Sequence, residues 1–211
     1  ILKEKDSSLT GALHWAPHFY NAWYGAEVSP IQFNDNCTLI RMKPGEKQGD
    51  TAIISILPDV GYVQVKNELV TGNKKRRRWT RALNDTLPII TVVENIGEKI
   101  DSAHLVLPVR NPPLYFKHAL LTALNDKGIS FEENKNQSRG IEIKSYSISG
   151  APLLSILDEI NQRSQNLHAE TLLRNMGKIV VNQGSVEGGK KAIHQYLTKI
   201  GLPAEDFEFV D

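Results

Sequence analysis

The spacing of apolar residues changes at Asn111, and this change constrains the fold more than any other feature of the sequence. Before Asn111, apolar residues occur in short or alternating runs, which are typical of strands. Turn signals such as Asn34-Asp35-Asn36 and Pro44-Gly45 separate these runs. We predict strands over residues 26–33, 38–42, 51–57, 62–65, 89–93 and 104–109.

Helical spacing follows Asn111. Pro112 and Pro113 fit the first turn of a helix, where a missing N–H costs nothing, and Gly128 predicts its end. A strand-like alternation at 141–143 comes next. Beyond Ser149, three apolar stripes at helical spacing predict three more helices. Their members are Leu153, Ile156, Leu157 and Ile160; then Ala169, Leu172, Leu173 and Met176, closed by Gly177; then Ile193, Tyr196, Leu197 and Ile200, closed by Gly201.

This order of elements predicts an α+β chain in which strands and helices are segregated. We expect residues 1–135 to form a β-rich accessory region of antiparallel structure, with a possible inserted sub-domain at about 66–105. Residues 136–211 should form a separate helical part. Hydrophobic residues make up 40% and charged residues 23%, which is ordinary for a globular protein, and no apolar run is long enough to span a membrane.

The most basic stretch is Lys74-Lys75-Arg76-Arg77-Arg78, which lies in the polar region between predicted strands. Such a run is a candidate for binding nucleic acid or another polyanion. The formal net charge of the chain is only +1, and Trp79 is the only aromatic neighbour of the run. We therefore favour a solvated loop or hairpin tip and expect no nucleic-acid partner.

The stretch from Gly184 to Lys191 nearly matches a phosphate-binding loop that follows a strand-like segment at 178–181. A functional loop needs Ser or Thr after its lysine to hold magnesium, and here that position is Lys191. We therefore favour a loop in which Ser185 caps the next helix. A nucleotide-binding protein built on this loop stays open as an alternative.

Candidate metal ligands are sparse. His14 and His18 have helical i, i+4 spacing but lack a third partner, and Cys37 is the only cysteine, so no thiolate cluster and no intrachain disulfide can form. We expect neither a metal nor an organic cofactor.

Ser164-Gln165-Asn166 lies between two predicted helices. Taken alone, Ser and Asn at such a place are typical helix caps. In context, the segment from Ile160 to Leu173, with Ala169-Glu170 after the tripeptide, resembles the Ser-x-Asn motif of the D-Ala-D-Ala carboxypeptidase/endopeptidase family, the class C low-molecular-mass penicillin-binding proteins.

Other stretches resemble the same family in the same order. Residues 24–36 are similar to its Tyr-x-Ala-x-x-Ser-x-Leu…Asn-x-Asn segment, and Asn111-Pro112-Pro113 through Gly128-Ile129 is similar to a helix that ends in Gly-Ile. Residues 184–202 are similar to the stretch before its catalytic C-terminal part.

Two family motifs, Ser-x-x-Lys and Lys-Thr-Gly, do not occur in residues 1–211. The resemblance places the first well before Ile1 and the second well after Asp211. It therefore implies an internal piece of a serine-type peptidase that is inactive alone and carries the helical part of the catalytic domain.

The resemblance also implies roles and partners. Ser164 would relay a proton to the leaving amine, and Asn166 would hold the substrate backbone and the catalytic lysine. The substrate would be peptidoglycan peptides ending in D-Ala-D-Ala, β-lactams would acylate the full-length enzyme, and the location would be the periplasm or another site outside the membrane. The alternative is a non-catalytic module that binds murein or a protein.

Overall fold

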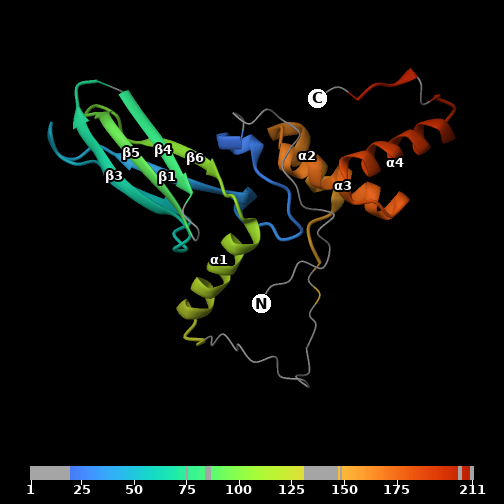
Figure 1. The fold of residues 1–211 in the computed structure, drawn as a ribbon, viewed down its shortest axis with the longest axis horizontal. Helices are drawn as coiled ribbons and strands as arrows, with labels where there is room; N and C mark the ends of the chain where they lie inside the picture. Colours follow the sequence, from blue (N-terminus) through green and yellow to red (C-terminus); the bar gives the residue numbers. More distant parts are fainter. Residues whose placement is uncertain are drawn as a thin grey trace.

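The structure is a computed structural model, and it describes residues 20–74, 76–83, 87–130, 147, 149–203 and 206–209. Two sheets and helix α1 form one side of the molecule, and helices α2, α3 and α4 form the other (Figure 1). The expected α+β class with segregated strands and helices is confirmed. The division into domains stays a proposal.

The first sheet has the order β2-β1-β6 and is antiparallel throughout. Its central strand β1 (Cys37–Lys43) pairs with β2 (Ile53–Leu57) on one side and β6 (Ala103–Pro108) on the other. Ile40 lies opposite Ile56 in β2 and Leu105 in β6. The apolar runs predicted at 38–42, 51–57 and 104–109 are these three strands.

The second sheet has the order β3-β5-β4 and departs from expectation in two ways. Strand β3 (Gln64–Gly72) runs parallel to β5 (Pro88–Gly97), although antiparallel pairing was expected. Strand β4 (Arg76–Leu83) contains most of the basic run that we assigned to a loop, and it pairs antiparallel with β5. Because β5 inserts between β3 and β4, these consecutive strands are not neighbours.

The three arginines of the run are compatible with an edge strand because their charges face solvent or a carboxylate. Glu94 of β5 accepts contacts from Arg76 Nε at 3.2 Å and from Arg78 Nη1 at 3.4 Å. Trp79 packs against the core on the other face. A charged edge also discourages pairing with a second sheet.

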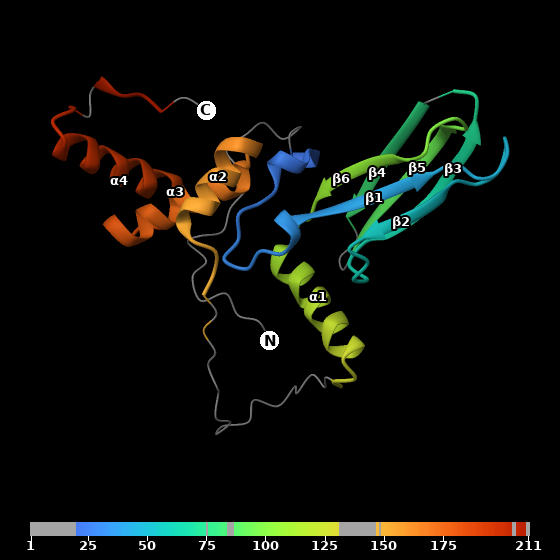
Figure 2. The same cartoon turned by 180° about the vertical axis from the view of Figure 1, so that it is seen from behind.

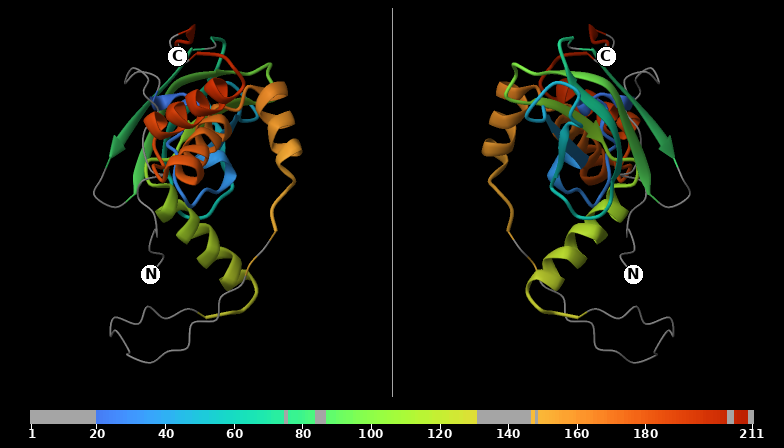
Figure 3. Two further views of the ribbon diagram at one scale, coloured as in Figure 1. Left: turned by 90° about the vertical axis from the view of Figure 1, so that its right-hand side faces the viewer. Right: turned by 90° about the vertical axis from the view of Figure 1, so that its left-hand side faces the viewer.

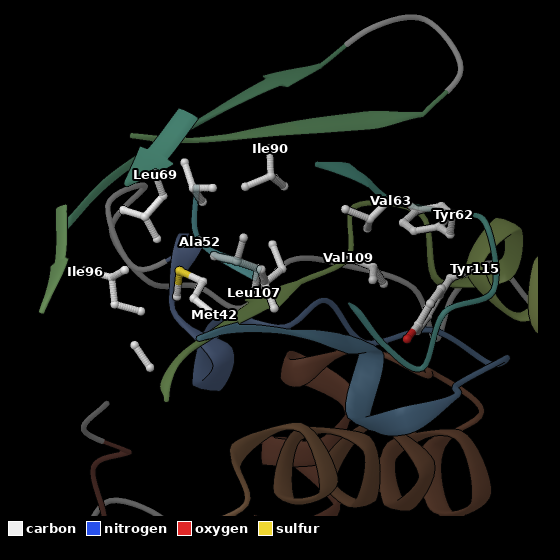
Figure 4. Close-up of a cluster of buried hydrophobic side chains, with 13 residues drawn as sticks. Met42, Ala52, Tyr62, Val63, Leu69, Ile90, Ile96, Leu107, Val109 and Tyr115 are labelled. Carbon is white, nitrogen blue, oxygen red and sulfur yellow. The ribbon is translucent and has the colours of Figure 1, made fainter. Parts of the chain in front are cut away.

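The main core lies between the two sheets, as Figure 4 shows. Each sheet contributes apolar side chains that are almost fully buried, and each such burial contributes roughly 1.5–3 kcal/mol. The most buried are Ile40, Leu69, Ile90, Val92, Ile96 and Leu107.

Helix α1 (Pro112–Asp126) closes one end of this core. It begins as expected: Asn111 Oδ1 accepts a hydrogen bond from Leu114 N at 3.0 Å. Buried Tyr115 donates to the carbonyl of Cys37 at 3.0 Å, and its ring packs at a tilt against Tyr62 with a centroid distance of 5.1 Å. The helix ends before Gly128, whose φ of 70° is the left-handed conformation that ends helices.

The helical side comprises α2 (Leu153–Arg163), α3 (Asn166–Val181) and α4 (Val186–Lys199), seen from behind in Figure 2. Helix α2 lies to one side of the paired α3 and α4 (Figure 3) and buries none of its residues. No helix in the described ranges is long and apolar enough to cross a membrane.

We expected Gly177 to end α3, but the helix continues past it. The strand-like segment at 178–181 is the last turn of that helix. The helix ends at Asn182, which has a φ of 54°. Gly177 is small because α4 crosses there: a Cβ on Gly177 would lie 2.5 Å from Gly188 C and from Gly189 N.

The strand expected at 26–33 is also wrong. These residues belong to neither sheet and instead link a short 3-10 helix (Trp23–Gly25) to a second one (Asn34–Asn36). Ala26 and Val28 are buried with Leu167 of α3 and with Cys37 at the start of β1, so the segment packs between the helical side and the first sheet without joining that sheet. The alternation at 141–143, like His14 and His18, lies outside the described residues.

Cys37 should be unreactive in the folded protein. Its side chain is buried, and burial, with a smaller contribution from Asp35, raises the pKa of the thiol to about 12. Its Sγ lies 3.6 Å from the carbonyl of Trp23. Thiolate is therefore scarce at pH 8. Ellman's reagent should label native protein only as fast as it unfolds, and denatured protein at once. Rapid labelling of native protein would contradict this burial.

Candidate active site

Ser164-Gln165-Asn166 forms the junction between α2 and α3. Ser164 has φ 52° and ψ 49°, a left-handed conformation that ends α2. Gln165 is extended, and Asn166 is the first residue of α3. Ser164 is exposed, and Asn166 is partly buried. The junction therefore lies where the helical stripes placed it.

The hypothesis that Ser164 is only a helix cap can be tested against the geometry of the structure. It requires the hydroxyl to bond to free backbone N–H groups at a helix start. In the described chain the N-cap position of α3 is Gln165, and no side chain caps α3 there. Backbone groups alone end helix α2: Ser164 adopts the left-handed conformation, and Gln165 N donates a hydrogen bond to Ile160 O at 3.3 Å. The Ser164 hydroxyl therefore does not cap α3 in the described chain, and its catalytic role stays a prediction.

Helix α3 is held in place by residues 24–36, the other stretch that resembles the family. Gln32 Nε2 donates to Thr171 Oγ1 at 2.9 Å, across 139 positions of sequence. His168 Nε2 lies 3.5 Å from Asp35 Oδ1. Two segments that share a family resemblance are therefore also in contact, and one of them carries the Ser-x-Asn junction.

The Asn34-Asp35-Asn36 turn orients this support. All three residues have φ between 50° and 52°, a conformation that Asn and Asp adopt more readily than other non-glycine residues. Asn36 is fully buried: its Oδ1 accepts from Phe33 N at 3.2 Å, and its Nδ2 donates to the Glu27 carbonyl at 2.8 Å. Its own carbonyl accepts from Val109 N at 2.8 Å. The turn thus connects the α3 support to the end of β6.

A cleft of about 390 Å³ lies between this support and the second and third turns of α3. Its lining includes Gln32, Thr171, Asn175 and Arg174. Arg174 is only 5% exposed, and its Nε lies 3.7 Å from Glu170 Oε2. The sequence analysis missed Arg174, because a Glu and an Arg four apart on a helix are typical of a solvated pair.

The Gly184 loop is a helix start. Ser185 Oγ accepts from Gly188 N at 3.1 Å and caps α4, as we expected. Lys191 Nζ donates to Gln183 Oε1 at 3.3 Å. Gly188 and Gly189 lie inside the helix against Gln183 and Leu173, so their small size serves helix packing.

Replacing Ser185 with Ala should cost about 1 kcal/mol of unfolding free energy, because one cap is lost. Ser185→Asp should restore most of it, since a carboxylate caps equally well. Ser155→Ala, at an exposed position early in α2, is the control and should change little. Urea unfolding measures all three. ATP should not raise the melting temperature; a rise that depends on ATP would favour the nucleotide-binding alternative.

Among the described residues, His, Cys, Asp and Glu side chains do not gather in groups of three or more that could hold a metal ion.

Comparisons with known proteins bear directly on this site. The sequence matches the D-Ala-D-Ala carboxypeptidase 3 (S13) family over residues 6–211. The chain belongs to this family. No curated protein sequence matches the chain significantly.

Solved structures share the fold of this S13 chain. One is penicillin binding protein 4 (dacB) from Haemophilus influenzae, with a TM-score of 0.66 and 17% identity, covering 93% of this chain and 45% of that chain. Another is the same protein complexed with a novel β-lactam, with a TM-score of 0.58 and 17% identity, covering 82% and 40%. The S13 chain thus spans less than half the length of these solved chains.

Proposed function

We propose that this chain is the internal part of a serine-type D-Ala-D-Ala carboxypeptidase/endopeptidase that trims peptidoglycan stem peptides outside the cytoplasmic membrane. Membership of the S13 family supports the peptidase class. The observation that carries the proposal further is the Ser164–Asn166 junction, with its exposed hydroxyl, on a helix anchored by residues 24–36.

The reaction would be acyl transfer through a serine and a lysine contributed by a Ser-x-x-Lys segment. The serine oxygen bonds to the carbonyl carbon of the D-Ala-D-Ala bond, the C–N bond breaks, and D-alanine leaves. Water then attacks the ester and releases the shortened peptide. A β-lactam would acylate the same serine, and the resulting acyl-enzyme would hydrolyse slowly.

Ser164 and Asn166 would act on the leaving group and the substrate. The Ser164 hydroxyl both donates and accepts, so it can pass a proton to the departing amine nitrogen. The Asn166 amide can donate to a substrate carbonyl while its oxygen accepts from an ammonium group. The location of Asn166 in the first turn of α3 fixes the direction of this side chain more firmly than a loop would.

Residues 1–211 alone should form no covalent adduct with a fluorescent penicillin and should not release D-alanine, because the nucleophile and base motifs are absent from this sequence. A chain that adds Ser-x-x-Lys and Lys-Thr-Gly segments of the family at the two ends should do both. Gel fluorescence and a D-alanine assay measure these outcomes. A stable fluorescent band on residues 1–211 would contradict the mechanism, and an inactive but folded extended chain would favour the non-catalytic binding module.

A further inference from the structure

A small cavity lies inside the β-rich side, far along the chain from Ser164. Apolar residues of both sheets form most of its wall, and Figure 4 labels several of them. Its polar lining comes from Arg81 in β4, Arg110 just after β6, Tyr62 and Thr38. Two guanidinium groups therefore line one small space at the edge of the core, where the Arg110 side chain is 28% exposed.

The hydrogen bonds of these two arginines are incomplete. Arg81 Nη2 donates to the Pro108 carbonyl at 2.9 Å, but Arg81 Nε and Nη1 are buried without a partner among the described protein atoms. Arg110 Nε is buried in the same way. Buried polar groups are nearly always hydrogen-bonded, and a buried N–H on a charged group without a partner costs more than a neutral one.

The charges around the cavity do not balance either. Glu27 pairs with Arg110, with 3.5 Å between Oε1 and Nη1, and the Tyr20 ring lies 5.5 Å from the Arg110 guanidinium carbon. Burial, with the nearby charge of Arg110, lowers the pKa of Arg81 to about 10, so Arg81 is still protonated at neutral pH. The two guanidinium groups thus share the single carboxylate of Glu27, which leaves one positive charge in excess.

The size of the cavity restricts what can bind. Its volume is about 10 Å³, close to the minimum that holds one water-sized body, so a chloride ion, which is larger than water, enters only as the walls move slightly outward. Acetate, phosphate and nucleotides are too large. We propose that this cavity is a binding site for one monovalent, monatomic anion of the halide class, held by Arg81 and Arg110 between the two sheets.

Such an anion would link the sheets. Arg81 belongs to the sheet of β3, β4 and β5, and Arg110 follows the last strand of the other sheet. A shared anion would supply the missing acceptor for both guanidinium groups and stabilise the packing of one sheet on the other. Stability should then depend on anion identity and not only on ionic strength.

Thermal unfolding of residues 1–211 tests this inference. Sodium chloride should raise the melting temperature above that in sodium gluconate of equal concentration, because gluconate is too large to enter. An anion present at several times its dissociation constant should give a rise of about 2–4 °C. Arg81→Met keeps most of the side-chain stem and should abolish the difference between the two salts. Arg77→Met, at an exposed position of the same strand, is the matched control and should retain it.

Crystals of the unmodified chain grown in bromide give a second measurement that does not depend on any variant folding. An anomalous peak between Arg81 and Arg110 is the expected result. Equal melting temperatures in the two salts, an unchanged difference in Arg81→Met, or bromide only at surface positions would overturn the proposal and leave water as the occupant.

Discussion

Ser164→Ala should reduce turnover of D-Ala-D-Ala peptides by roughly 100- to 10,000-fold, the usual effect of losing a proton-transfer group. The measurement needs an enzyme in which this chain is joined to its Ser-x-x-Lys and Lys-Thr-Gly motifs. The melting temperature should stay nearly unchanged, because the hydroxyl caps no helix start in the described chain. Asn166→Ala should also lower turnover and should slow acylation by penicillin.

Gln165→Ala is the matched control for both variants. Gln165 occupies the variable middle position, and its side chain makes no capping bond, so turnover and stability should both persist. The opposite result for Ser164→Ala would contradict the proposed catalytic role. Early melting with near-normal kcat would make Ser164 a structural residue and would remove it from the mechanism.

Gly177→Ala should lower the free energy of unfolding by about 1–3 kcal/mol or more, the range for overpacking a tight interface. At an exposed helical position the same change would stabilise by up to about 1 kcal/mol, because alanine favours helix. Here the new Cβ would lie 2.5 Å from backbone atoms of Gln183, Gly188 and Gly189. Backbone atoms cannot swing aside as a flexible side chain would, so α3 and α4 must separate.

The control for Gly177→Ala is Ile179→Ala on the same helix. Ile179 is 82% exposed, so its loss should change stability little. Urea denaturation followed by circular dichroism compares the two variants with the parent. If Gly177→Ala is as stable as the parent, the close crossing of α3 and α4 is wrong.

Local signals predicted the elements that depend on local physics. Asn111 before two prolines predicted the start of α1, and Ser185 was correctly assigned as a cap, because both features act within one helical turn. Ser164 and Asn166 fell at a helix junction because the apolar stripes on either side have clear helical spacing.

Features that depend on distant partners were not predictable from local spacing. Strand β4 is polar because one of its faces is solvated, so its apolar signal is weak, and only pairing with β5 makes it a strand. Gly177 was interpreted as a helix end because the sequence does not show that α4 crosses there. The burial of Arg174 is likewise not visible in the local sequence, because the cleft that Arg174 lines is completed by residues of the 28–32 segment, more than a hundred positions away.

The left-handed backbone of Ser164 has a consequence for which amino acids the position can accept. With φ at 52°, a side chain branched at Cβ clashes with its own main chain. Threonine carries the same hydroxyl group, yet its extra methyl makes it a poor occupant here. Glycine and asparagine tolerate this backbone but lack a hydroxyl. Serine alone among the coded residues combines a small aliphatic alcohol with an unbranched Cβ, so the turn that ends α2 and the chemistry proposed for it select the same residue.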